Sequence, residues 1–304
     1  MTRPPFPSVI DSTLMAAIKA CPRKAAWAYI DHYKPISTSV HLHAGKAYAE
    51  GLEAARIAFY LEGKSESESI ALGLGALMRA YGDFECPEDS AKSLNRMMGA
   101  FEFYMERYPM PEDHAVPITL PSGKRGIEFS FAEPIDLKHP ETGDPLIYVG
   151  RMDMICDYAG GRFGEDDKTT SSLGATWSRQ WELRSQFTSY CWGARQAGIP
   201  LNGFLVRGVS ILKTKYDTQE AITYRPAWLI DRWYEGMLKK LSDFIRQWEE
   251  GKFDYNLDES CNAYGGCEFK QVCQSVDPTP WLKGSFIRRR WDPVSREEIL
   301  LEED

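Results

Sequence analysis

The chain has 304 residues, of which 43% are hydrophobic and 26% are charged, a composition typical of a globular protein with a sizeable core. Its formal net charge of −8 argues against a protein that coats nucleic acid through overall positive charge, although a local basic groove could still hold DNA. No apolar run approaches the roughly 20 residues that span a bilayer, and residues 1–13 lack the apolar region of a secretory signal. We therefore expect a cytoplasmic protein without a membrane partner.

The first third of the chain is predicted to be helical. Residues 12–30 have a helical pattern that Pro22 interrupts, because proline fits badly in a helix interior. Apolar side chains recur every three or four positions in residues 43–63, and residues 93–109 form a third helix. We interpret residues 60–115, which include the polar helical stretch between them, as a helical insertion.

The middle of the chain changes to the period of a β-sheet. Residues 126–135 and 146–158 alternate or run apolar as strands do, and Gly160-Gly161 is a hairpin signal that makes the following residues the partner strand. Residues 176–198 return to a helical pattern, and a further strand and a long amphipathic helix follow.

The predicted hairpin carries an unusual density of charge, in the stretch "GRMDMICDYAGGRFGEDDKTT" of residues 150–170. Strand geometry places Asp166 and Lys168 on one face and Asp167 on the other, and Asp153 of the preceding strand can share the face of Asp166. Two neighbouring carboxylates resist ionisation unless a cation lies between them, and Mg²⁺ is commonly held in this way. A lysine beside the ion can orient water or stabilise charge on a phosphate, so the pattern is typical of phosphodiester cleavage. A solvated, charged hairpin is the plainer alternative.

The stretch "GRMD … EDDKTT" resembles the signature of the PD-(D/E)xK nuclease superfamily in its RecB-like branch, and the C-terminal tail that begins with "FDYNLDESC" resembles that of phage-encoded members. The resemblance implies an α/β fold with a mixed central β-sheet flanked by helices, a restriction-endonuclease-like core, in one nuclease domain over residues 1–304. It also covers "QFTSY", in which Gln186 and Tyr190 match the Q-x-x-x-Y motif of that branch and share one helix face. These two residues are implied to hold the substrate strand; otherwise they are a surface glutamine and an interfacial tyrosine.

The same resemblance implies the metal site. Asp153 and Asp166 would bind Mg²⁺ or Mn²⁺, Asp167 would add its backbone carbonyl, and Lys168 would position the attacking water. Glu128 lies on the strand before the hairpin, where related proteins often carry a glutamate, and is a further candidate ligand; an exposed strand residue is the equal alternative.

One position departs from the family pattern. RecB-like enzymes commonly show G-x-x-x-H with a metal-binding histidine, but here Gly45 is followed by Ala49 at the expected place. Either Glu50 or Glu53 substitutes, with Glu53 favoured because it lies one turn from Ala49, or the metal has fewer protein ligands, or catalysis has been lost. The plain reading of both glutamates is a solvated helix face.

Three of the seven cysteines, Cys261, Cys267 and Cys273, crowd near the end of the sequence with the spacing C-x5-C-x5-C. Close thiolates favour a soft metal or a cluster, and this spacing is wider than that of structural zinc pairs. Cys21 is the obvious fourth ligand. The set resembles that of RecB-like nucleases with a [4Fe–4S] cluster, including CRISPR-associated and AddB-type enzymes, although their last three cysteines are often spaced x2 and x5. Zn²⁺ and buried free thiols are the alternatives.

The resemblance implies that the cluster joins residues 12–30 to residues 255–280. The remaining cysteines are interpreted as core or surface thiols: Cys86, Cys156 and Cys191. Arg288, Arg289 and Arg290 form a basic run that either contacts phosphates or is a solvated face.

Taken together, these patterns predict a metal-dependent DNA nuclease, an exonuclease acting on single strands or duplex ends. The implied settings are phage or bacterial recombination, repair or CRISPR-type DNA processing, in the host cytoplasm if the chain is phage-encoded, with recombination or CRISPR-type protein partners. One alternative is a catalytically weakened protein of this fold that binds DNA ends or a recombination partner. A more remote one is an iron–sulfur redox protein. Oligomeric state is left open.

Overall fold

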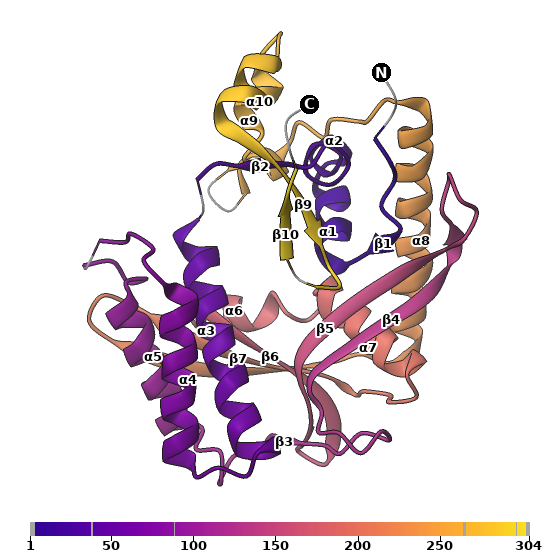
Figure 1. Ribbon diagram of the computed structural model, residues 1–304. Helices are drawn as coiled ribbons and strands as arrows, with labels where there is room; N and C mark the ends of the chain where they lie inside the picture. The colour runs from indigo at the N-terminus through magenta and orange to yellow at the C-terminus, as the bar shows by residue number, and fades with distance from the viewer. Residues whose placement is uncertain (1–3, 38, 88, 264–265, 296, 302–304) are drawn as a thin grey trace. The chain divides into compact units, whose positions relative to one another are not determined.

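The computed structural model describes residues 4–37, 39–87, 89–263, 266–295 and 297–301 (Figure 1). The chain divides into two compact units. The first comprises Met1–Ser37, Phe131–Gly150 and Asp231–Asp304, and the second comprises Thr38–Ser130 and Arg151–Ile230. No helix among the described residues is long and apolar enough to cross a bilayer.

A mixed β-sheet is the framework of the second unit. The antiparallel hairpin of β5 (Pro145–Tyr158) and β6 (Gly161–Thr170) turns through Ala159 and Gly160, whose φ angles of 49° and 78° suit a tight two-residue turn. β6 pairs in parallel with β7 (Gly203–Ile211), and β7 pairs antiparallel with β8 (Tyr216–Tyr224). The remaining pairings are those of β1 (Val9–Ile10), β3 (Val116–Pro117) and β4 (Ile127–Lys138), each with β5. This arrangement confirms the predicted mixed central sheet.

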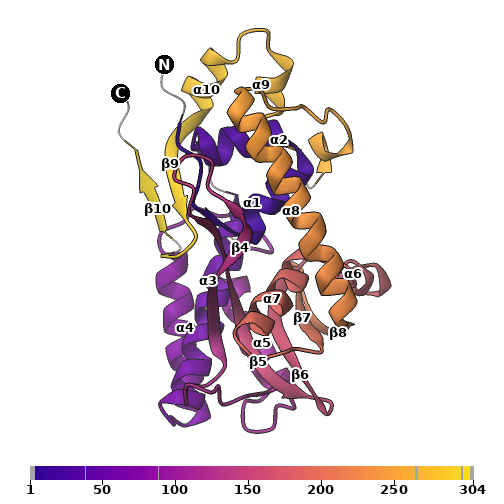
Figure 2. The same cartoon turned by 90° about the vertical axis from the view of Figure 1, so that its right-hand side faces the viewer.

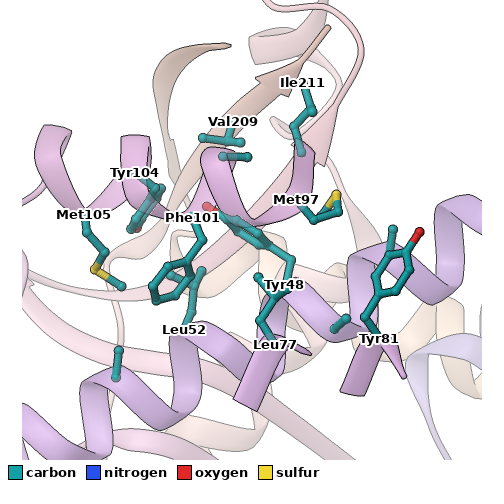
Figure 3. Packing of buried hydrophobic residues seen from close by; sticks show 14 of the residues in the cluster. Tyr48, Leu52, Leu77, Tyr81, Met97, Phe101, Tyr104, Met105, Val209 and Ile211 are labelled. Atoms are coloured by element: carbon teal, nitrogen blue, oxygen red, sulfur yellow. The ribbon is translucent and has the colours of Figure 1, made fainter. Parts of the chain in front are cut away.

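The two faces of β7 are covered by different helices, because alternate residues of a strand point to opposite sides. Val209 and Ile211 pack into a core formed with α3 (Val40–Arg56), α4 (Glu66–Tyr81) and α5 (Leu94–Arg107), as Figure 3 shows. On the other face, Phe204 stacks on Phe187 of α7 (Ser185–Gln196), with ring centroids 4.6 Å apart. The sheet is therefore flanked by helices, as predicted.

Close approach of α3 and α4 is built on small residues. A side chain at Gly73 would collide with the backbone of Gly51 and with the ring of Phe101, so glycine lets the two helices touch. Ser65 and Glu68 form a capping box that starts α4. The segment predicted as a helical insertion contains α4 and α5, and both lie beside α3 (Figures 1 and 2).

The predicted helix over residues 176–198 is wrong as a single element. It is divided into α6 (Ala175–Arg179) and α7. The carbonyl oxygen of Trp181 accepts a hydrogen bond from Nη2 of the buried Arg225 at 2.8 Å, and it also accepts the N–H of Arg184. The backbone between the two helices is thus satisfied by a turn and an arginine instead of a continuous helix.

The first unit brings the N-terminal helices beside the C-terminal segment. α1 (Ser12–Ala20) ends before Cys21, whose extended backbone leads into α2 (Pro22–Ala25), so the predicted interruption at proline is confirmed. A small sheet has the order β10 (Glu297–Leu300), β9 (Phe286–Asp292), β2 (Tyr33–Pro35). Phe269 stacks on Phe286 with centroids 4.7 Å apart, in a core that also contains Trp27.

The other elements of the chain complete the description. They are the π-helical turns η1 (Ala26–Ile30) and η2 (Ile57–Leu61), α8 (Ala227–Glu250), η3 (Glu259–Cys261), α9 (Lys270–Gln274) and α10 (Thr279–Ser285). The basic run of the sequence lies on β9, where Arg288 packs over the ring of Tyr33 and Arg289 pairs with Glu298.

Candidate active site

Two charged residues of β6 point to the same face of the sheet. Asp166 lies beside Val206 and Lys168 beside Gly208 in the parallel register with β7. The carboxylate of Asp166 and Nζ of Lys168 form an ion pair, with side-chain exposures of 5% and 31%. The strand therefore presents a buried acid whose lysine partner still reaches solvent.

Asp153 joins this pair from the neighbouring strand β5. Its Oδ2 accepts a hydrogen bond from the backbone N–H of Asp167 at 3.1 Å. Burial raises the pKa of Asp153, the charge of Asp167 raises it further, and Lys168 opposes the increase. Burial raises the pKa of Asp166 to about 7, Lys168 lowers it, and Asp153 raises it. The structure thus brings together the three side chains on which the sequence prediction depends.

The opposite face of β6 carries a different set of charges. Arg56 at the end of α3 donates through Nη1 to Oδ2 of Asp167 at 2.7 Å and through Nη2 to Oε1 of Glu165 at 2.6 Å. Nη2 also donates to the hydroxyl of Tyr104 at 3.1 Å. All three charged side chains are at most 7% exposed. A guanidinium fork of this kind fixes both neighbours of Asp166 to the helical layer.

A second arginine extends this buried network. Arg207 of β7 donates in a bidentate manner to Asp113, with both distances 2.6 Å, and through Nε to Glu220 at 2.9 Å. Its Nη1 lies 3.6 Å from Glu165. Burial raises the pKa of Glu165 to about 7 despite both arginines. No sequence pattern indicated this network of Arg56, Arg207 and their carboxylate partners. The position of Arg56 four residues after Leu52, on the apolar stripe of α3, is the signal that could have shown it.

The two glutamates predicted as further metal ligands share another partner. Arg151 of β5 donates through Nη2 to Oε1 of Glu53 at 2.7 Å, and its Nε pairs with Oε2 of Glu128. Glu128 has a φ of 53°, in the left-handed region that glutamate rarely adopts. Burial raises the pKa of Glu128 to about 7; Asp153 and Glu53 raise it and Arg151 lowers it. Two carboxylates, those of Glu53 and Glu128, therefore share one guanidinium, and the charge of Asp153 also acts on Glu128.

The predicted Q-x-x-x-Y residues lie together on α7. Nε2 of Gln186 donates to the hydroxyl of Tyr190 at 3.0 Å. Burial raises the pKa of Tyr190 to about 12, and the charges of Asp166, Lys168 and Asp153 also act on it. Tyr190 is therefore close to the Asp-Lys face of β6.

The position of the missing histidine is exposed on α3, where Ala49 stands. Nearby His43 is engaged elsewhere, since its ring stacks on Phe84 at 4.1 Å and its Nε2 lies 2.8 Å from the carbonyl oxygen of Tyr81. Glu50 lies 3.7 Å from Lys46 in a surface pair. The structure thus shows other partners for His43 and Glu50, and their predicted relation to a metal stays a prediction.

The carboxylates fit a divalent cation by their chemistry. Burial raises the pKa values of the half-buried Asp153 and the buried Asp166, and the positive charge of a bound cation would lower them. No three His, Cys, Asp or Glu side chains in the described part of the chain are grouped as ligands of one ion. Mg²⁺ usually keeps several waters and needs only one or two carboxylates, so a two-carboxylate site is adequate.

Four cysteines line one cavity in the first unit. The cavity has a volume of about 210 Å³, and its walls include Trp27, Tyr255 and Phe269. The four thiols on it are those of Cys21, Cys261, Cys267 and Cys273, and none is in a disulfide. Burial and the other three thiols raise the pKa of Cys273 to about 11. The four predicted ligand residues thus share the walls of one cavity, although their side chains are not grouped as ligands of one metal ion among the described residues.

Most of the sequence matches the model of a known family. The model of the PD-(D/E)XK nuclease superfamily matches residues 14–274, most of the chain, and the protein belongs to this superfamily. A comparison with curated proteins gave no match.

Similar folds occur among solved structures, and two of them are described here. One is a protein from Eubacterium rectale provisionally described as an exonuclease, at 12% identity, with 84% of this chain and 88% of that chain covered and a TM-score of 0.47. The other is the protein SSO0001, at 12% identity, with 66% and 73% covered and a TM-score of 0.29. Likenesses this distant do not bear on function.

Proposed function

We propose that this protein is a metal-dependent DNA nuclease that hydrolyses phosphodiester bonds. The observation that supports this most directly is the meeting of Asp153, Asp166 and Lys168 on one face of the β5–β6 hairpin. A superfamily of nucleases implies the reaction class, and these residues supply the chemistry. The raised pKa of the two carboxylates supports a cation between them.

Each residue is assigned a role that its position allows. Asp153 and Asp166 would hold Mg²⁺ or Mn²⁺, with the backbone carbonyl of Asp167 beside them. The bound ion would activate water and neutralise charge on the phosphate. Lys168 orients the attacking water with its ammonium, and Tyr190, kept in place by Gln186, contacts the substrate strand near the cleaved bond.

The substrate we propose is DNA with a free end, so that the protein acts as an exonuclease of the RecB-like branch. The motif order, Asp153 and then D-x-K followed by Q-x-x-x-Y on the next long helix, supports that branch. Phage or bacterial recombination, repair or CRISPR-type processing is the proposed setting.

A nuclease assay tests the proposal. End-labelled single-stranded and duplex DNA is incubated with Mn²⁺ and the wild-type protein, Asp166→Ala or Lys168→Ala. Cleavage that proceeds from ends and is lost in both variants is the expected result. Asp157→Asn is a matched control, because Asp157 lies on the same strand as Asp153, is exposed and is far from the cluster in the ladder. DNA binding without cleavage by the wild type would favour the non-cutting alternative.

We also propose that the four cysteines hold a [4Fe–4S] cluster with a structural role. The cavity that they line, and the mutual effect of their charges on Cys273, support this. The cluster would tie Cys21, between α1 and α2, to the C-terminal segment. Anaerobic purification followed by iron, sulfide and zinc analysis is the test. Iron and sulfide that fall together in Cys267→Ser are expected, and stoichiometric zinc would refute the cluster.

A further inference from the structure

Arg151 of β5 is paired with two carboxylates in the second unit. Its guanidinium bridges Glu53 of α3 and Glu128 of β4 and is 31% exposed at the side chain. The arginine stands two residues before Asp153 on the same strand, so both side chains leave the same face of β5. The proposed metal ligand and the arginine are therefore neighbours.

Both glutamates are committed to this arginine. Oε1 of Glu53 is 2.7 Å from Nη2, and the carboxylate of Glu128 pairs with Nε. The left-handed backbone at Glu128 is strained, and such strain persists only where the surroundings enforce it. Charge-assisted hydrogen bonds to a guanidinium are strong enough to compensate.

We propose that Arg151 is a built-in cation that replaces a second metal ion, so that the protein binds a single divalent ion through Asp153 and Asp166. This inference rests on the proposed nuclease function. Without Arg151, the carboxylates of Glu53 and Glu128 would lose the cation that they share and could take a second metal ion in its place. With it, Glu53 and Glu128 act as positioning residues for the arginine and do not bind the metal.

The sequence departure at Ala49 fits this arrangement. Exposed Ala49 supplies no ligand, and the glutamate one turn further along α3 is already paired with Arg151. Enzymes with two ions use the pair to stabilise both the attacking and the leaving oxygen of an in-line displacement. Here Lys168 and Arg151 would provide the fixed positive charge that a second ion would otherwise supply.

Counting bound ions tests the inference apart from activity. Purified full-length protein is titrated with Mn²⁺ at pH 8, and the free ion is measured by electron paramagnetic resonance. We expect one Mn²⁺ per wild-type chain, two per Arg151→Met chain and one per Arg151→Lys chain. Two ions in the wild type, or one in a folded Arg151→Met variant, would overturn the inference and leave the nuclease proposal intact.

Two further variants separate the possible failures. Glu53→Gln should still bind one ion per chain, with a loss of affinity of at most about 10–100-fold, the usual cost of removing a positioning partner; loss of the ion altogether would refute the inference even if Arg151→Met does not fold. Asp166→Asn should bind none; no Mn²⁺ in the wild type would end both proposals. Arg246→Met is the matched control, because Arg246 bridges Asp243 and Glu250 at 2.6 and 2.7 Å on an exposed helix, and its loss should add no ion.

Discussion

The two faces of strand β6 place their acidic side chains in opposite electrostatic environments. On one face, Asp166 is buried with a single lysine that reaches solvent. On the other face, Glu165 and Asp167 both form ion pairs with Arg56, and Glu165 also lies near Arg207 in a network of buried ion pairs. Because alternate residues of β6 point to opposite sides, its two faces differ. The face of Asp166, with Lys168 as the cationic partner, is called the incomplete face, and the face of Glu165 and Asp167, which pair with arginine, is called the complete face. The incomplete face therefore has the fewer cationic partners for its acid, and it is the face on which an added cation would be favourable.

The largest expected effect comes from breaking the complete face. Arg56→Met leaves two buried carboxylates without their partner, so the free energy of unfolding should fall by about 3–5 kcal/mol. Urea denaturation followed by circular dichroism measures this. Arg56→Lys, which keeps the charge but not the fork, should lie between the variant and the wild type. An unchanged midpoint for Arg56→Met would show that the two faces do not differ in this way.

The incomplete face should behave in the reverse manner. Asp166→Asn should lower the rate of DNA cleavage by at least about 10²-fold, the usual cost of removing a group that organises charge in the reaction. Its stability at pH 8 should nevertheless equal or exceed that of the wild type, because the raised pKa of Asp166 means that its charged form opposes folding. Thermal melts and end-labelled DNA assays give both values. A strongly destabilised variant would contradict the comparison.

A buried lysine tests the same contrast in another place. The side chain of Lys92 is buried, its Nζ has no hydrogen-bond partner among the described residues, and burial lowers its pKa to about 8. Lys92→Met should raise the free energy of unfolding by about 1–2 kcal/mol below pH 8, where the lysine is charged in both states. Between about pH 8 and 10.4 the unfolded chain binds more protons, so the wild type gains stability as pH rises and the advantage disappears. Melts from pH 6 to 11 measure this, and a pH-independent advantage would disprove the explanation.

The smallest expected effect concerns the helix beside the incomplete face. Tyr190→Phe removes the hydrogen bond from Gln186, worth about 1 kcal/mol. Because the ring remains, we expect a rise of several-fold in the KM for DNA with little change in kcat. A large fall in kcat alone would instead make the Tyr190 hydroxyl part of the chemical step.

Local patterns in the sequence predicted much of the site and of the sheet. The alternation of Asp166 and Lys168, the turn at Gly160 and the spacing of Gln186 and Tyr190 depend on neighbouring residues alone, and each is present in the structure. The mixed sheet flanked by helices was likewise predictable. The interruption at Pro22 was predictable because proline acts on its own backbone.

What the sequence could not provide are contacts between distant residues. Arg56 is 111 positions from Asp167, and Arg207 is 94 from Asp113, so no periodicity indicates these partners. The division of the predicted helix into α6 and α7 depends on Arg225, which is 44 positions from its acceptor. The roles of Glu53 and Glu128 were left open for the same reason, since Arg151 joins them only in three dimensions.

The hydrogen bonds of Arg56 to both neighbours of Asp166 have a consequence for molecules in which a helix has unfolded or been cleaved. One buried guanidinium joins α3 to β6, so unfolding or proteolysis of α3 would also remove the partner that holds Glu165 and Asp167. A partly unfolded or proteolysed molecule would therefore lose the geometry of β6 together with its helical layer.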